Sequence, residues 1–114
     1  MEWYERLSQL YNLSPFEQDW GICNSNGERV GDFITLFLKH EEEDPWEWEE
    51  LADLVFESAN DAIENGTLTD EQEAQVILIV AEHKEKFPNQ LKYWLEFSNE
   101  IDYPVKKLIS RGNG

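Results

Sequence analysis

Basic residues are scarce in this sequence and absent from its middle third. The 114 residues include 25 Asp and Glu but only nine Lys and Arg, which leaves a net charge of −16. No Lys or Arg lies between positions 40 and 83, where fifteen of the acidic residues fall, whereas the rest of the chain is nearly balanced. This charge argues against direct binding to nucleic acid or to an anionic membrane, and it favours a basic partner.

Cysteine and long apolar runs are also scarce. Cys23 is the only cysteine, so we expect no disulfide and a small, partly buried thiol in a reducing compartment. The longest apolar run, VILIVA at positions 76–81, is much too short to span a membrane. The first ten residues, MEWYERLSQL, lack the basic start and apolar stretch of a secretory signal. A soluble cytoplasmic protein is therefore expected.

Aromatic residues, by contrast, are plentiful. They make up 13% of the chain, with five Trp and six Phe, and hydrophobic residues as a whole reach 40%. A disordered acidic tail would not carry so much apolar material. Because 114 residues suit one domain, we expect a single folded domain over 1–114 with a modest core.

The clearest predicted element is a helix from Pro45 to Gly66. Asp44 and Glu47 are spaced as a capping box around Pro45, and Gly66 suits the C-terminal cap. One face carries an apolar stripe that is expected to meet the core, made of Trp48, Leu51, Ala52, Val55, Ala59, Ala62 and Ile63.

Further helices are predicted on both sides of this one. Apolar spacing indicates a first helix within 2–13, and Ser14 with Glu17 forms a capping-box pattern for a short helix or turn. Asn26-Gly27 allows either a small hairpin within 20–32 or a loop that leads into a helix. We prefer the loop, with the following helix turning Val30, Phe33, Ile34 and Phe37 toward the core.

The C-terminal half is predicted to be helical as well. A capping box at Thr69 and Gln72 starts a helix whose apolar run at 76–81 is expected in the middle of a bundle. Two shorter helices are expected at 89–97 and near the C-terminus, with a loose tail at 110–114. The predicted architecture is therefore an all-α bundle of about five or six helices.

Carboxylates recur at helical spacing on the side of the 45–66 helix that lies opposite its apolar stripe. Trp46 and Leu54 fall among them and are expected to stand as apolar islands in an acidic surface. The predicted partner-binding set comprises Glu43, Trp46, Glu47, Glu50, Asp53, Leu54, Glu57, Asp61 and Glu64.

Two interpretations of this acidic side remain open. A run of charge is often only a solvated face, but like charges at helical spacing cost about 0.2–0.5 kcal/mol per pair, and no Lys relieves them here. Partner binding would explain that cost. Trp46 either folds back as a staple at the start of its helix or serves as an interface anchor.

The sequence offers no recognisable pattern for catalysis or metal binding. The stretch 61–72 loosely matches a calcium loop, but Ile63 and Gln72 occupy two positions that need ligands. His40 and His83 lack a metal-binding spacing, and His40 is expected to be solvated at a helix end. We expect no enzymatic activity, no catalytic residue, no metal and no cofactor.

Two stretches, EEEDPWEWEELADLVFE at 41–57 and LKYWLEFSNEIDYPVKKLI at 91–109, carry a resemblance. In its acidity, size and tryptophan content the chain resembles the immunity proteins of bacterial toxin–immunity systems, including contact-dependent growth inhibition. The resemblance implies a cytoplasmic protein that binds and neutralises a cognate toxin, often a basic nuclease. It assigns no individual site residue.

A second class fits the same charge. A DNA mimic from a phage or plasmid would use carboxylates in place of phosphates to inhibit a restriction or CRISPR enzyme. Such a mimic should be acidic over most of an elongated surface, whereas here the surplus charge belongs to one third of the chain. This distribution favours a local docking surface.

Overall fold

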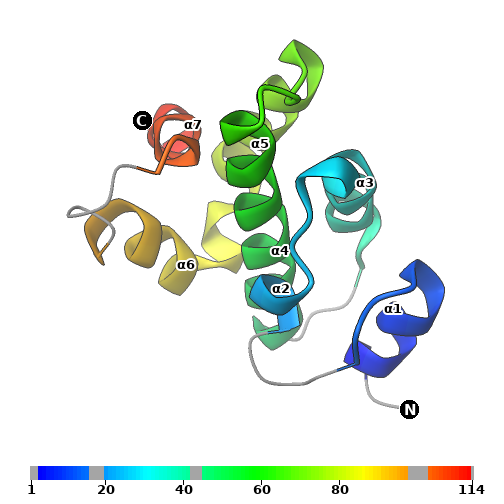
Figure 1. Cartoon of the computed structure of the whole chain (residues 1–114). Helices are drawn as coiled ribbons and strands as arrows, with labels where there is room; N and C mark the ends of the chain where they lie inside the picture. Colours follow the sequence, from blue (N-terminus) through cyan, green and yellow to red (C-terminus); the bar gives the residue numbers. More distant parts are fainter. Residues whose placement is uncertain (1–2, 16–19, 42–44, 98–102, 114) are drawn as a thin grey trace.

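The computed structural model describes residues 3–15, 20–41, 45–97 and 103–113, and all regular elements within these ranges are helical. The predicted all-α fold is confirmed (Figure 1). The α-helices are α1 (Trp3–Tyr11), α2 (Trp20–Cys23), α3 (Val30–Lys39), α4 (Pro45–Glu64), α5 (Asp70–His83), α6 (Pro88–Lys92) and α7 (Val105–Asn113). Two 3₁₀ turns, η1 (Gly27–Arg29) and η2 (Lys84–Lys86), and a π-helical turn, η3 (Tyr93–Phe97), complete the set.

Helix α4 is the centre of the bundle, and α2, α3, α5, α6 and α7 all contact it. In the view of Figure 1, α2 lies in front of α4 and α5 lies behind it. Along α4, the fully buried positions are Leu51, Ala52, Leu54, Val55, Phe56, Ser58, Ala59 and Ala62. The stripe predicted to meet the core is buried except at its end, where Ile63 is partly exposed.

The expectation that the 76–81 segment would be central is wrong. This segment belongs to α5, where Val76, Ile79 and Val80 are buried but Leu78 is 47% exposed. Helix α4 takes the centre because it is longer and carries apolar side chains on more than one side, which lets several helices pack around it.

Aromatic rings form a connected layer through the core. Phe37 packs edge-on against Trp48 and Phe87, with ring centroids 5.2 and 5.8 Å apart. Phe56 then joins Phe87 to Trp94 at 5.6 and 6.3 Å. Edge-to-face pairs at these separations stabilise the fold beyond the burial of their area. The layer holds α3, α4 and η3 together, so most of the aromatic content serves the core.

The segment between α2 and α3 takes the loop-and-helix form. The Asn26 side chain accepts a hydrogen bond from the Glu28 N–H at 2.9 Å and so begins η1 rather than a hairpin. Helix α3 follows directly and buries four predicted core residues, Val30, Phe33, Ile34 and Phe37. Within residues 20–41 the structure contains no strand.

Local capping signals are confirmed where the structure describes them. Thr69 and Gln72 form both bonds of the capping box that begins α5. Gly66 adopts a φ of +72° just after α4, as a C-terminal glycine does. The cap predicted at Asp44 and the box member Glu17 lie outside the described residues.

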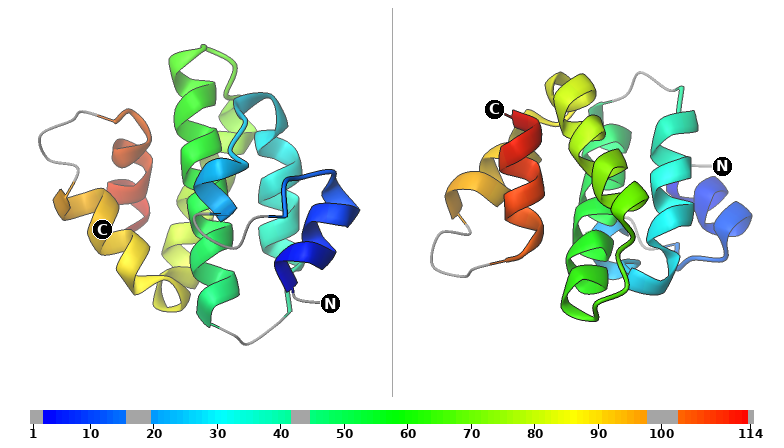
Figure 2. Two further views of the ribbon diagram at one scale, coloured as in Figure 1. Left: turned by 60° about the horizontal axis from the view of Figure 1, so that its bottom comes forward. Right: turned by 90° about the horizontal axis from the view of Figure 1, so that it is seen from above.

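The C-terminal segment is packed rather than loose as far as Asn113. Helix α7 runs to that residue along α5 (Figure 2). Gly112 is buried at the contact, where a β-carbon would lie 2.6 Å from the Ile77 carbonyl oxygen. The prediction of a loose tail from position 110 is therefore wrong for 110–113. None of the described helices combines the length and apolar character that crossing a membrane requires.

Candidate functional site

One side of α4 is covered by the chain itself. Residues 20–29, which include α2 and η1 and are called the strap here, run along the helix and bond to its polar side chains (Figure 1). The Gly21 N–H donates to Glu50 Oε2 at 2.8 Å, and the Gly27 N–H donates to Asp61 Oδ2 at 3.0 Å. Between them, the Asn26 N–H donates to Ser58 Oγ at 2.9 Å.

Glycine makes this close approach possible. A β-carbon on Gly21 would lie 2.2 Å from the Glu50 carbonyl oxygen, and one on Gly27 would lie 2.8 Å from the Ala62 nitrogen. No other residue type could occupy these positions without moving the strap away from α4. Glu50 and Asp61, both predicted to bind a partner, thus already hold backbone N–H groups of their own chain.

Two further members of the predicted set are buried. Leu54 has no exposed surface, because α4 is covered on that side by the strap, so it is a core residue and not an apolar island. Glu47 is 4% exposed, and its Oε1 lies 3.8 Å from Arg6 Nη2 and 4.0 Å from His40 Nε2. Glu43 lies outside the described residues.

The remaining members form a single exposed strip along α4. Asp53 and Glu57 are partly exposed, Glu64 is exposed, and Trp46 is 69% exposed. At roughly 100° per residue these four positions fall within about 20° of one line down the helix. We call them the acidic strip. It lies between the strap and the α6–η3 segment, which pack on either side of α4.

Partial burial and neighbouring negative charges together raise the pKa values of the two carboxyl groups at the centre of the strip. Burial, followed by the neighbouring charges of Glu50 and Glu57, raises the pKa of Asp53 from 3.8 to about 7. The polar side chains of Gln90 and Trp94 act in the opposite direction. Burial, followed by the charge of Glu64, also raises the pKa of Glu57.

Four of these acids have no basic partner among the described residues. Neither Asp53, Glu57, Asp61 nor Glu64 forms an ion pair with any residue that the structure describes. Elsewhere in the described residues acidic side chains do form ion pairs. Glu73 Oε1, for example, lies 3.0 Å from Arg111 Nη1.

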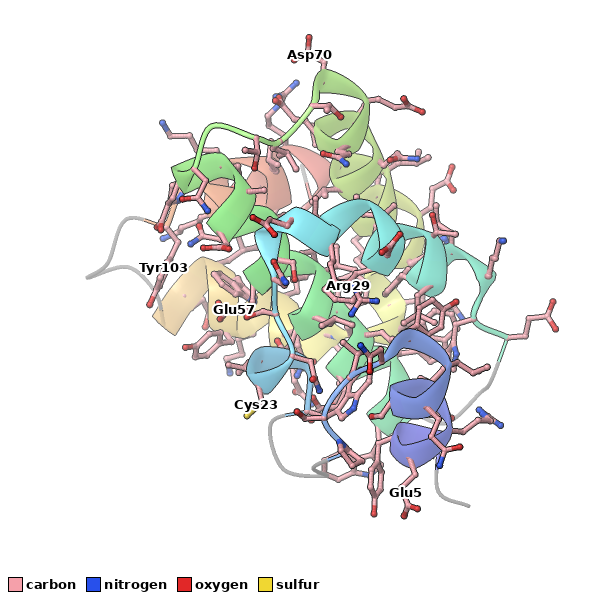
Figure 3. The ribbon with its side chains drawn as sticks, turned by 45° about the vertical axis from the view of Figure 1, so that its right-hand side comes forward. Glu5, Cys23, Arg29, Glu57, Asp70 and Tyr103 are labelled. Carbon is pink, nitrogen blue, oxygen red and sulfur yellow. The ribbon has the colours of Figure 1, made fainter. Side chains whose placement is uncertain are left out.

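Exposed apolar side chains occur on both segments that pack beside the strip. Ile22 of α2 is 42% exposed, and Tyr93 of η3 is 46% exposed. Burial raises the pKa of Tyr93, and Tyr103, Glu57 and Asp53 add to the effect, which places the phenol beside the two carboxylates. Figure 3 shows Glu57 on the same side of the molecule as Cys23 of α2 and Tyr103. The strip and its neighbouring segments therefore combine carboxylates with exposed apolar side chains.

Cys23 and His40 both differ from their predicted environments. Cys23 is exposed, because α2 ends there and directs the side chain outward, where a partly buried thiol was expected. The His40 side chain is 5% exposed instead of solvated, and its ring lies 4.8 Å from that of Trp48. His40 is part of the packing that joins the start of α4 to the end of α3.

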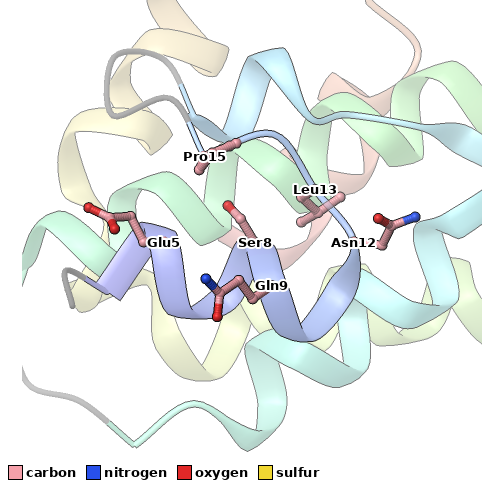
Figure 4. A pocket seen from close by; sticks show the side chains of 6 residues that line it. All are labelled: Glu5, Ser8, Gln9, Asn12, Leu13 and Pro15. Atoms are coloured by element: carbon pink, nitrogen blue, oxygen red, sulfur yellow. The ribbon is translucent and has the colours of Figure 1, made fainter.

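Two shallow pockets lined by described residues lie at α1. One, of about 390 Å³, is lined by Glu5, Ser8, Gln9, Asn12, Leu13 and Pro15 (Figure 4). Its buried polar group, the Ser8 hydroxyl, already accepts a hydrogen bond from Trp20 Nε1 at 2.8 Å. The other, of about 250 Å³, lies between α1 and the end of α3. It is lined by Arg6, Leu7, Leu10, Tyr11, Leu36, Lys39, His40 and Glu41.

Within the described ranges, no three His, Cys, Asp or Glu side chains are placed to hold a metal ion. Comparison of the chain with protein-family models, with curated proteins and with solved structures finds no match. The acidic strip is therefore the candidate functional site on its geometry and charge alone.

Proposed function

We propose that this protein is an immunity-type inhibitor that binds and neutralises a cognate basic toxin, of the nuclease class, through the acidic strip of α4. The observation that carries the proposal is a line of carboxylates without basic partners, which ends in the 69% exposed Trp46. Repulsion along such a line of like charges lowers the free energy of unfolding, and a bound cationic partner would remove this repulsion.

A basic nuclease suits this surface for a chemical reason. Its substrate cleft carries Lys and Arg that normally bind phosphates. An acidic inhibitor can bind these groups instead, and charge complementarity speeds the encounter of the two proteins. Exposed aromatic side chains such as Trp46 then supply the apolar contacts that slow dissociation.

Co-expression and titration test the function directly. The toxic domain encoded beside this gene should arrest growth when expressed alone, and growth should resume when this protein is produced with it. In vitro, toxin activity should fall linearly and end near one equivalent of inhibitor. If no neighbouring product is toxic and the protein instead blocks a DNA-processing enzyme, the DNA-mimic class would replace this proposal.

A further inference from the structure

We propose that the acidic strip docks a basic loop or helix of the partner, with a Lys or Arg side chain seated between Asp53 and Glu57 and with Trp46, Ile22 and Tyr93 as its apolar contacts. This inference rests on the proposed function and identifies the chemistry of its interface. It also divides the predicted set into residues that face the partner and residues that hold the strap.

Packing covers much of α4 on either side of this strip. Leu51 and Phe56 are fully buried, and the strap bonds to Glu50 and Asp61, although Asp61 keeps an exposed surface. Asp53 lies at the strap's edge, since a β-carbon on Gly21 would come within 3.1 Å of the Asp53 Cβ. The strap and η3 thus both approach Asp53, through Gly21 on one side and Trp94 on the other.

Charge complementarity selects a basic occupant over a second copy of this chain. A copy would bring a net charge of −16 against an acidic surface, and the two proteins would repel. An arginine or lysine of a partner gains two carboxylates and, through Tyr93, an aromatic face on which a cation packs well. Trp46 lies two helical turns from Asp53, about 10 Å along the helix, so it would contact another part of the same partner.

Seating a cation here must release protons near neutral pH. The groups that face Asp53 are Glu50 and Glu57 on α4, Gln90 on α6, and Tyr93 and Trp94 on η3, whereas the strap contributes only Gly21, which has no side chain. None of these groups is a cation. Since the pKa of Asp53 is about 7, a bound cation would lower it and expel the proton that Asp53 holds at pH 6.5.

Hexa-arginine peptide is a suitable probe, with hexa-citrulline as its uncharged match. At 0.05 M salt we expect hexa-arginine to bind with an affinity that rises between pH 6 and pH 8. Calorimetry in buffers of different ionisation enthalpy should show release of about one proton at pH 6.5. Hexa-citrulline should not bind.

Two double variants locate the site, because each replaces two acidic side chains with neutral amides at a different place on the surface. Asp53→Asn with Glu57→Gln should weaken hexa-arginine binding about tenfold or more and abolish proton release. Glu82→Gln with Glu85→Gln, exposed on α5 and η2 behind α4, should weaken it less than about threefold and leave proton release unchanged. Equal weakening by both variants, or no proton release by the unmodified protein, would overturn the inference.

The same variants separate this inference from the proposed function. If the protein neutralises a toxin and the Asp53/Glu57 variant does so equally well, the docking site is wrong while the function stands. If the strip binds hexa-arginine as described but no toxin is neutralised, the docking chemistry stands and the function is wrong. Dimerisation that only the Asp53/Glu57 variant abolishes would assign the strip to a second copy and reject the basic partner.

Discussion

The carboxyl group of Asp53 makes the stability of the fold decrease as the pH rises. Its pKa rises from 3.8 in the unfolded chain to about 7 in the folded protein, because the group is partly buried beside other acids. Between these two values the folded state holds a proton that the unfolded state has lost. The free energy of unfolding therefore falls as pH rises from about 4 to 7, and it is constant for this group above that range.

Replacement by asparagine should remove this dependence. Asp53→Asn is expected to stabilise the protein relative to the parent by more at pH 8 than at pH 5. The difference between the two pH values should be roughly 1–2 kcal/mol, a figure reduced to allow for solvent screening of a partly exposed group. Urea denaturation at the two pH values measures the difference. Equal effects of the substitution at pH 5 and pH 8 would show that Asp53 is ionised throughout.

Trp46 and Trp48 lie two positions apart but belong to different environments. Trp46 is 69% exposed, whereas Trp48 is 6% exposed and packs against Phe37 and His40, with Lys86 Nζ 4.5 Å from its ring centroid. Trp48→Ala should lower the free energy of unfolding by about 3–5 kcal/mol. Trp46→Ala should change it by less than about 0.5 kcal/mol, which thermal unfolding of the two variants will check. A comparable loss for Trp46 would make it the staple that the sequence also allowed.

At the scale of the element, the strap depends on two glycines. Gly21→Ala places a β-carbon 2.2 Å from a backbone oxygen that cannot move aside, so the strap must lift and the Gly21–Glu50 bond must break. We expect a loss of about 2–4 kcal/mol in stability. Gly31→Ala is the matched control, since its β-carbon would meet only the end of the Gln72 side chain at 3.2 Å. Its stability should change by less than about 1 kcal/mol, and similar losses for both variants would contradict this account.

The helices themselves were predictable because their signals are local. The box at Thr69 and Gln72, the glycine at 66 and the apolar stripe of α4 each lie within a few residues of the structure that they specify. The strap was not predictable in this way. Its bonds join residues 29 to 34 positions apart, and no local pattern pairs a backbone N–H with a distant carboxylate.

The candidate site was predicted in part for the same reason. Helical spacing placed Trp46, Asp53 and Glu57 on one exposed side of α4, and their exposure agrees. It also placed Leu54 there, although that residue is buried beneath the strap. A signal was present: Leu54 and Phe56 both fall outside the apolar stripe, and apolar side chains on several sides indicate a helix that is covered on several sides.

At the scale of the whole molecule, charge opposes folding. The molecule measures 36 × 27 × 25 Å, and the full sequence of 114 residues carries a net charge of −16. The Debye length shrinks from about 14 Å at 0.05 M salt to about 4 Å at 0.5 M, so added salt should screen repulsion across much of the molecule. We expect the melting temperature at pH 7.5 to rise by roughly 5 °C over this range.

The pH at which the charge vanishes supplies the control for this prediction. At the sequence pI of about 4.2 the net charge is zero, because about half of the acids are protonated and the rest balance the basic groups. The same salt change should therefore leave the melting temperature almost unaltered. An equal rise at both pH values would indicate a general salting-out effect instead of charge repulsion. Salt should act in the opposite direction on docking, because screening slows the encounter with a cationic partner. A protein that becomes more stable while its association becomes slower would show that the same surplus of carboxylates opposes folding and favours docking.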